Sequence, residues 1–240
     1  MIRSLSAAFL LAASLAAGAS EESAPFHFKP DTGNVASLQR GARDFMAYCS
    51  GCHSLKYLRY NRLGNDLRIP PKALEQNLMF TSDKPGDHIL SSMPAASADW
   101  FGKQPPDLSL EARYRGANWV YSYLLSFYLD PSRPTGVNNL VLKGASMPHV
   151  LGDLQGWQML KPAPEDEGAL EKPEFEIAVP GTMKPEEYKG FVADLTNFLV
   201  YAAEPGRNGR IGTGVAVLLY LLILFAVTWA LKQEYWKDVH

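Results

Sequence analysis

The sequence AYCSGCHSLKYLRYNRL, residues 47–63, contains both cysteines of the 240-residue chain. Cys49 and Cys52 are separated by two residues, and His53 follows directly. Residues three apart on a helical turn have Cβ atoms about 5–6 Å from each other, so the two sulfurs face the same side. Two thiols at this spacing favour a disulfide or a thioredoxin-like redox pair, but the adjoining histidine adds a metal-binding nitrogen at the same place.

The pattern C-x-x-C-H is the attachment signature of c-type haem. Each thiol adds across one vinyl group of the porphyrin, and the imidazole that follows binds the iron. One nitrogen of His53 is then the iron ligand, and the other is expected to donate to a backbone carbonyl that fixes the ring. The sequence has no further cysteine to complete a zinc site. The motif therefore predicts one covalently bound haem c, held by Cys49, Cys52 and His53.

Apolar segments at the two ends of the chain predict export and anchoring. Residues 1–19 combine a basic start, an Ala-rich apolar run and a final Ala-Gly-Ala, which is typical of a signal peptide; an uncleaved anchor is the alternative. Residues 211–231 contain no charge, and their roughly 31 Å of helix would cross a bilayer; a buried soluble helix is the alternative. We expect a bacterial inner-membrane protein with a periplasmic haem domain at 20–210, a transmembrane anchor at 211–231 and a cytoplasmic tail at 232–240.

Hydrophobic periodicity predicts a mainly α fold. Asn34 caps a helix that runs to about Cys49 and has an apolar face of Val35, Leu38, Ala42 and Phe45. Pro185 starts a second helix, expected to pack across the first through Tyr188, Phe191, Val192, Leu195, Phe198, Leu199 and Ala202. The apolar, aromatic stretch 118–129 is expected to be a buried helix. Together these elements predict a class I-like c-type cytochrome domain with long loops plus one C-terminal transmembrane helix.

The spacing of residues leaves the second axial ligand of the iron open. Methionine would raise the reduction potential, a second histidine would lower it, and a vacant position would permit ligand chemistry. Most methionines fill cores, and spacing does not choose among Met93, Met147 and Met183. The small and rigid residues around Met147 predict a stiff loop that can lie close to a flat ring. The remaining histidines of the exported part are His27, His88 and His149.

Four stretches in a fixed order resemble the cytochrome c1 family, the c-haem subunits of quinol–cytochrome c reductase (cytochrome bc1) complexes. They are AYCSGCHSLKYLRYNRL, PPDLSLEARYRGANWVYSYLLSFY at 105–128, GASMPHVL at 144–151 and GTMKPEEYKGFVADLTNFLVYAAEP at 181–205. The four stretches, followed by a single apolar span, cover most of residues 34–231. A bare C-x-x-C-H would not be specific, whereas this combination is.

The resemblance implies further site residues. Met147 stands at the position of the family's distal iron ligand, and Pro106 borders the haem cleft. Arg115 is the best match to an arginine that approaches a haem propionate. Arg113 is the alternative, because Gly-Ala-Asn replaces a longer H-G-G-type stretch of the family. Trp119 stands where the family usually has a tyrosine beside the propionates, and its indole N–H can supply the same kind of hydrogen bond.

The resemblance also implies a function in respiration. The chain would be a one-electron carrier that accepts from the Rieske iron–sulfur protein and donates to cytochrome c, in a dimeric complex with cytochrome b. It would thus belong to an enzyme without itself holding the quinol site. The alternatives are a membrane-tethered mono-haem cytochrome that feeds a terminal oxidase, and a haem enzyme or gas sensor with an open sixth position.

The distribution of charge excludes one class of partner and suggests another. The formal net charge is −2, and no basic face of the kind that nucleic-acid binding requires is visible in the sequence. Residues 165–176 hold six acidic residues and one lysine. Such a run is usually a solvated loop. The alternative is a docking surface that steers a basic soluble cytochrome c.

Overall fold

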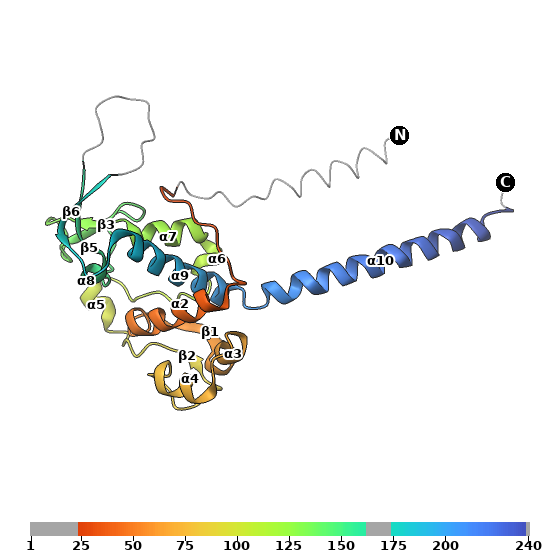
Figure 1. Cartoon of the computed structure of the whole chain (residues 1–240), viewed down its shortest axis with the longest axis horizontal. Helices are drawn as coiled ribbons and strands as arrows, with labels where there is room; N and C mark the ends of the chain where they lie inside the picture. The colour runs from red at the N-terminus through yellow and green to blue at the C-terminus, as the bar shows by residue number, and fades with distance from the viewer. Residues whose placement is uncertain (1–23, 162–173, 239–240) are drawn as a thin grey trace, which may run out of the picture. The chain divides into compact units, whose positions relative to one another are not determined.

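The computed structural model describes residues 24–161 and 174–238 (Figure 1). The predicted signal peptide and most of the acidic segment lie outside these residues. The principal helices are α2 (Val35–Tyr48), α3 (Tyr60–Asp66), α4 (Pro71–Asn77), α7 (Ala117–Leu125), α9 (Pro185–Ala203) and α10 (Arg207–Tyr235). Shorter ones are α5 (Ser97–Phe101), α6 (Glu111–Tyr114) and α8 (Gly152–Gln155). The strands are β1 (Leu55–Arg59), β2 (His88–Ile89), β3 (Phe127–Leu129), β4 (Val137–Asn139), β5 (Gly156–Leu160) and β6 (Phe175–Pro180). The prediction of a mainly helical chain with one C-terminal membrane-length helix is confirmed.

The chain divides into two compact units, each of which we describe by itself. The first comprises the described residues of 1–29 and of 114–192, and the second comprises 30–113 and the described part of 193–240. Helix α9 begins in the first unit and continues into the second. All seven residues of its predicted apolar face are buried. The motif at residues 49–53 belongs to the second unit, and Met147 to the first.

In the second unit, α2 packs across the later part of α9, as the sequence predicted. The Asn34 side chain caps α2 by accepting from the Ser37 N–H at 3.1 Å. The Ser37 hydroxyl donates to Asp194 of α9 at 2.6 Å. The rings of Phe45 and Phe198 lie 5.6 Å apart between centroids. The helices approach most closely at Gly41, where an added Cβ would overlap the Asp194 carbonyl. This packing fixes the helix that leads into Cys49.

The remaining elements of the second unit surround the segment that follows the motif. Strand β1 pairs antiparallel with β2, with Leu55 opposite Ile89. Helices α3 and α4 lie beside this pair and bury Leu63, Leu67 and Leu74. The Tyr201 hydroxyl of α9 donates to Asp66 at 2.9 Å and connects α3 to α9.

In the first unit, the predicted helix over 118–129 is wrong in its last part. Helix α7 ends at Leu125, and Phe127–Leu129 form strand β3, which pairs antiparallel with β4. The cause is tertiary: the buried Asn139 side chain donates to the Tyr123 carbonyl at 2.8 Å, and the Leu140 N–H donates to the Ser126 carbonyl at 3.1 Å. These bonds satisfy carbonyls at the helix end and favour the strand that follows.

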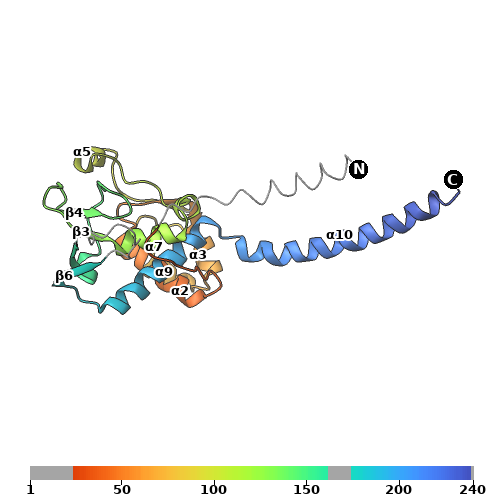
Figure 2. The same cartoon turned by 90° about the horizontal axis from the view of Figure 1, so that it is seen from above.

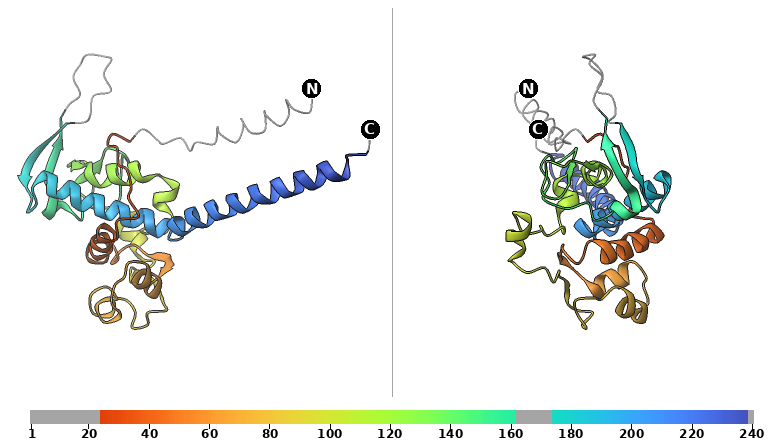
Figure 3. Two further views of the ribbon diagram at one scale, coloured as in Figure 1. Left: turned by 45° about the vertical axis from the view of Figure 1, so that its right-hand side comes forward. Right: turned by 90° about the vertical axis from the view of Figure 1, so that its left-hand side faces the viewer.

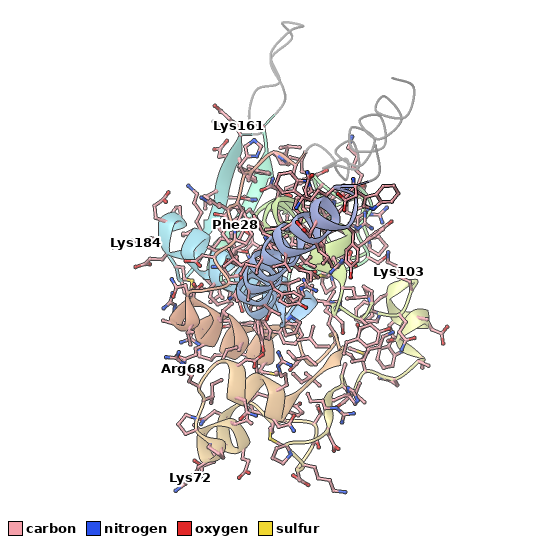
Figure 4. The ribbon with its side chains drawn as sticks, turned by 90° about the vertical axis from the view of Figure 1, so that its right-hand side faces the viewer. Phe28, Arg68, Lys72, Lys103, Lys161 and Lys184 are labelled. Carbon is pink, nitrogen blue, oxygen red and sulfur yellow. The ribbon has the colours of Figure 1, made fainter. Side chains whose placement is uncertain are left out.

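The N-terminal residues of the first unit run along α7. The Phe26 N–H donates to the Ser122 hydroxyl at 3.1 Å, and the Phe28 N–H donates to the Asn118 side-chain oxygen at 2.6 Å. Phe28, labelled in Figure 4, stacks on Tyr121 with 4.9 Å between ring centroids. The helix is therefore covered by a segment almost a hundred residues away in sequence.

Strands β5 and β6 form an antiparallel hairpin (Figure 3). Phe175 and Glu176, the last two residues of the predicted acidic loop, begin β6 and pair with Leu160 and Met159. Glu174 forms an exposed ion pair with Lys161 at 3.2 Å. The expectation of a loop is thus wrong for residues 175 and 176, because cross-strand pairing with β5 extends the hairpin to them.

Helix α10 is a single uninterrupted helix (Figure 2). Its most apolar 18-residue window has a mean hydropathy of 2.5, and none of that window is buried inside the protein. At 1.5 Å per residue, the 29 residues of α10 form a helix longer than a bilayer core is thick. It contains the predicted anchor 211–231 and extends beyond it at both ends.

Candidate haem-binding site

The cysteine motif forms a tight turn directly after α2. The Cys49 N–H donates to the Phe45 carbonyl at 2.8 Å and ends the helix. The Cys49 carbonyl then accepts from the N–H groups of Cys52 at 3.0 Å and His53 at 2.8 Å. The two cysteines therefore keep the spacing of one helical turn that the motif predicted, although they follow the last residue of α2. Both cysteines are free thiols and partly exposed.

The surroundings of Cys49 disfavour the thiolate form of its side chain. Burial is the largest cause that raises the pKa of the Cys49 thiol, to about 12, and the neighbouring Cys52 adds to the effect. Catalytic cysteines of thioredoxin-like enzymes have lowered pKa values, because the thiolate is the reactive form. The shift at Cys49 is opposite in direction to that of such catalytic cysteines.

His53 is held by a backbone carbonyl. Its Nδ1 lies 2.7 Å from the Pro106 carbonyl oxygen, and the residue is only 9% exposed. Burial lowers the pKa of the imidazole, while the Pro106 carbonyl opposes this shift, as do the carboxylates of Glu111 and Asp107. A neutral imidazole whose Nδ1–H donates to Pro106 presents its Nε2 lone pair to a metal. This geometry is the one that an iron ligand needs.

Arg115 and Trp119 lie together in the first unit. The Arg115 guanidinium stands 4.6 Å from the centre of the Trp119 ring, a cation–π distance. Trp119 also stacks on Tyr123 with a centroid distance of 5.1 Å. In the described part of the chain, the buried Trp119 indole N–H has no hydrogen-bond partner. Such a donor needs an acceptor, and a propionate carboxylate would supply one.

Arg113, the alternative to Arg115, has a different partner. It forms an ion pair with Glu204, which also accepts from Arg210 at 3.0 Å. The hydrogen bond from Arg210, followed by the charges of Arg113 and Arg207, lowers the pKa of the Glu204 carboxyl. Arg113 thus connects to the start of α10, whereas Arg115 lies at the unsatisfied indole.

Met147 lies in a loop of the first unit that side chains hold in place. Gly144 precedes it at φ 77°, a conformation that favours glycine. The Gly144 N–H donates to the Asn138 side-chain oxygen at 2.8 Å, and its carbonyl accepts from Arg133 at 3.1 Å. Met147 itself is partly exposed. The expectation of a stiff loop agrees with these contacts.

The loop is also fixed on its C-terminal side, by His149. Its ring stacks on Phe127 with 4.9 Å between centroids and meets the edge of Trp157 at 5.7 Å. Burial lowers the pKa of His149 to about 4, with Gln155 opposing the shift. The His149 ring is therefore neutral at pH 7 and packs between Phe127 and Trp157.

The structure brings the predicted site residues together in two groups. Cys49, Cys52, His53 and Pro106 meet in the second unit, and Arg115 meets Trp119 in the first, which also contains Met147. Met93 lies in the second unit, where its N–H donates to the Ser91 hydroxyl at 3.0 Å, and Met183 lies in the first, where its N–H donates to the Leu154 carbonyl at 3.1 Å.

Sequence reasoning missed the polar side chains that hold these groups. Asn138 and Asn139 brace the Met147 loop, and Asp107 and Ser109 contact the segment after His53. The spacing D-x-S at 107–109 is a signal for a local turn that could have pointed to Asp107.

The residues present fit a c-type haem. Two free thiols one turn apart precede an imidazole that is neutral and oriented through Nδ1. A buried indole N–H without a partner in the described residues lies beside an arginine. Residues 24–161 and 174–238 include no cluster of three His, Cys, Asp or Glu side chains that could hold a bare metal ion.

Comparisons with known proteins place the chain in a family. The model of the "Cytochrome C1 family" matches residues 26–239. Cytochrome c1 of Allochromatium vinosum is 52% identical over 213 residues, which is 88% of this chain and 87% of the relative. A protein of Nitrosomonas europaea named "Ammonia monooxygenase gamma subunit" is 42% identical over 241 residues, covering 100% and 99% of the two chains. A chain of a solved structure, "Hyperthermophilic respiratory Complex III", covers both chains completely with a TM-score of 0.46 and 17% identity, which is too distant to support an inference. On the family model and the sequence identity, the chain belongs to the cytochrome C1 family.

Proposed function

We propose that the chain is the electron-carrying c-haem subunit of a respiratory quinol–cytochrome c reductase. Cys49 and Cys52 would hold a haem c covalently, and His53 and Met147 would bind its iron. The observation that carries the proposal is the 2.7 Å contact between His53 Nδ1 and the Pro106 carbonyl. In a buried site directly after two free thiols, this contact leaves Nε2 as the metal-binding nitrogen.

The protein residues supply positioning and a shielded environment. The bound haem would supply the one-electron chemistry. His53 provides an oriented, neutral imidazole, and Met147 would raise the reduction potential, as methionine ligands do. Arg115 and Trp119 would hold a propionate by charge and by an indole hydrogen bond. No general acid or nucleophile is required of the chain. In this electron-transfer role the chain is one subunit of an enzyme and does not itself hold the quinol site.

The proposed partners follow from the family. The electron would arrive from the Rieske iron–sulfur protein and leave to a cytochrome c, in a dimeric complex that includes cytochrome b. We infer that residues 20–210 lie in the periplasm, that 211–231 cross the membrane and that 232–240 remain in the cytoplasm. The exposed apolar surface of α10 supports the membrane anchor.

Purification of the chain together with the protein subunits bound to it tests this function. The full chain would be tagged at its C-terminus, extracted from membranes in mild detergent and isolated. We expect a b-type cytochrome and a Rieske cluster to co-purify, and quinol to reduce the c-type haem of the complex. Quinol reduction should fail in a complex from which the Rieske protein has been removed. Isolation of the chain with a terminal oxidase instead, or binding of CO by its reduced haem, would contradict the proposal.

A second candidate comes from the name of the Nitrosomonas relative, which describes a subunit of ammonia monooxygenase. The 42% identity over the whole chain is the observation that favours it. The same purification decides between the two, since co-isolation with monooxygenase subunits and without a Rieske cluster would support this second candidate.

A further inference from the structure

The Pro106 carbonyl that orients His53 belongs to a segment without regular secondary structure. Residues 105 and 106 are both prolines and have no N–H with which to anchor the backbone. One backbone bond in the vicinity, from the Leu108 N–H to the Ser54 carbonyl at 2.9 Å, connects the segment to the residues after His53. The position of the carbonyl must therefore depend on further contacts.

Asp107, the residue next to Pro106, supplies two of these contacts. Its Oδ2 accepts from the Lys56 N–H at 2.9 Å, and its Oδ1 accepts from the Ser109 N–H at 3.0 Å. The first bond crosses to β1, three residues after His53, and the second closes a local turn. The Ser109 hydroxyl then accepts from the Tyr57 N–H at 3.1 Å. Four hydrogen bonds thus join the segment 106–109 to residues 53–57, and two of them use side-chain oxygens.

We propose that Asp107 is a positioning residue for His53. By accepting from Lys56 and Ser109 together, its carboxylate holds the Pro106 carbonyl against His53 Nδ1 and so sets the orientation and basicity of the imidazole. Only an ionised carboxylate has two equivalent acceptor oxygens, because an amide at this place has one oxygen and presents N–H groups to a donor. This inference rests on the proposed role of His53 as an iron ligand.

The arrangement has a consequence for the haem. A carbonyl that accepts a strong hydrogen bond from Nδ1–H makes the imidazole a stronger donor to iron. Mutation of outer-sphere partners of this kind typically costs about 10- to 100-fold in metal affinity or activity. A stronger donor favours the oxidised iron and lowers the reduction potential. Loss of the Asp107 contacts should therefore raise the potential and change the ligand field that the iron experiences.

The test uses the full, haem-loaded chain with two variants and two controls. Asp107→Asn removes the charge and one acceptor, whereas Asp107→Glu keeps the charge but displaces both oxygens. Asp31→Asn is the matched control: Asp31 accepts from the Gly33 N–H at 3.0 Å in the same kind of local turn and in the same unit. Glu111→Gln removes a second carboxylate that acts electrostatically on His53.

Two measurements separate positioning from charge: the reduction potential and the electron paramagnetic resonance spectrum of the oxidised haem. For Asp107→Asn we expect the equilibrium constant for one-electron reduction to rise on the order of tenfold, about 59 mV, with altered g values. Asp107→Glu should alter the g values as well. Glu111→Gln should raise the potential while keeping the g values of the parent protein, and Asp31→Asn should change neither quantity.

The inference is overturned if Asp107→Glu matches the parent protein in both quantities, or if Asp107→Asn behaves as Glu111→Gln does. Should neither Asp107 variant accumulate, Ser109→Ala decides: a smaller change of g values in the same direction supports the inference, and an unchanged spectrum contradicts it. If instead the parent chain carries no covalent haem, or His53→Ala keeps the parent spectrum, the proposed function fails and not the role of Asp107.

Discussion

The segment around His53 and the loop around Met147 are held in different ways. At the turn that contains His53, backbone carbonyls contact the ligand residue directly: the Cys49 carbonyl accepts from Cys52 and His53, and the Pro106 carbonyl lies at the imidazole. Around Met147, side-chain oxygens accept from the backbone of the loop. Asn139 accepts from the N–H groups of Val141 and Leu142, at 2.9 and 3.1 Å.

The difference shows why one proposed ligand can be read from the sequence and the other cannot. Covalent attachment requires two thiols and an imidazole within one turn, so the proximal residues are contiguous in the chain. A distal ligand needs only to lie in a loop that other residues hold, and those residues are scattered from Tyr123 to Trp157. Mutations on the two sides should therefore have different effects.

The largest effect is expected from the two thiols. Replacement of Cys49 and Cys52 by serine together removes both attachment points, so covalent haem should be lost completely. Haem staining of the full chain after denaturing electrophoresis measures this. A single Cys49→Ser or Cys52→Ser change should leave some chains with one thioether bond. Haem that stays on the chain without either cysteine would refute covalent attachment at this motif.

On the distal side, Met147→Leu should keep the covalent haem but change its coordination. The weak absorption band at the red end of the spectrum that marks methionine bound to ferric iron should disappear. The reduction potential should fall, since axial ligands set haem potentials over a range of about 0.8 V. Met93→Leu and Met183→Leu are the matched controls and should keep the band. Its loss in either control, with retention in Met147→Leu, would assign the distal ligand elsewhere.

The side-chain support of the Met147 loop is tested by Asn139→Ala. This change leaves the Tyr123 carbonyl and two half-buried N–H groups without their partner. With a cost of about 1–3 kcal/mol for each unsatisfied group, partly relieved by water, the free energy of unfolding should fall by about 3 kcal/mol. Urea unfolding of the solubilised chain measures it. Asn77→Ala, which removes only an exposed bond within α4, should change stability by less than about 0.5 kcal/mol.

The support of the proximal side is tested by Gly41→Ala. The new Cβ would lie 2.7 Å from the Phe198 Cβ and would overlap the Asp194 carbonyl, so α2 must shift away from α9. Overpacking of this kind costs about 1–3 kcal/mol. Gly190→Ala in α9, where nothing lies within 4 Å of the added Cβ, should instead stabilise the helix by up to about 1 kcal/mol. Equal stabilities of the two variants, from the same urea unfolding experiment, would contradict the tight crossing.

The elements that sequence predicted well are those with strong local signals. Helix α2 has its Asn34 cap and apolar face, α9 has a proline start and two acidic residues in its first turn, and α10 has a long uncharged run. The end of α7 could not be predicted, because Asn139, sixteen residues from Tyr123, decides where the helix stops. The role of Asp107 was hidden for the same reason: its decisive partner is the backbone of Lys56, 51 residues away.

The site shows the same division. Cys49, Cys52 and His53 follow from the chemistry of attachment, whereas Met147, Arg115 and Trp119 were assigned only through the family resemblance. The structure adds that Arg115 lies over Trp119 while Arg113 pairs with Glu204, a distinction that the sequence left open. The division of residues 20–210 between two compact units was not visible in the sequence either, since each unit combines segments far apart in the chain.

We propose above all that the haem is six-coordinate, with His53 and Met147 as its ligands, and closed to exogenous ligands. Near-infrared magnetic circular dichroism of the oxidised full chain tests it most directly, because the position of the charge-transfer band distinguishes histidine–methionine from histidine–histidine and histidine–water coordination. We expect a histidine–methionine band in the parent protein and no change of the reduced spectrum under CO. A histidine–histidine or histidine–water band, or a reduced haem that binds CO, would contradict it.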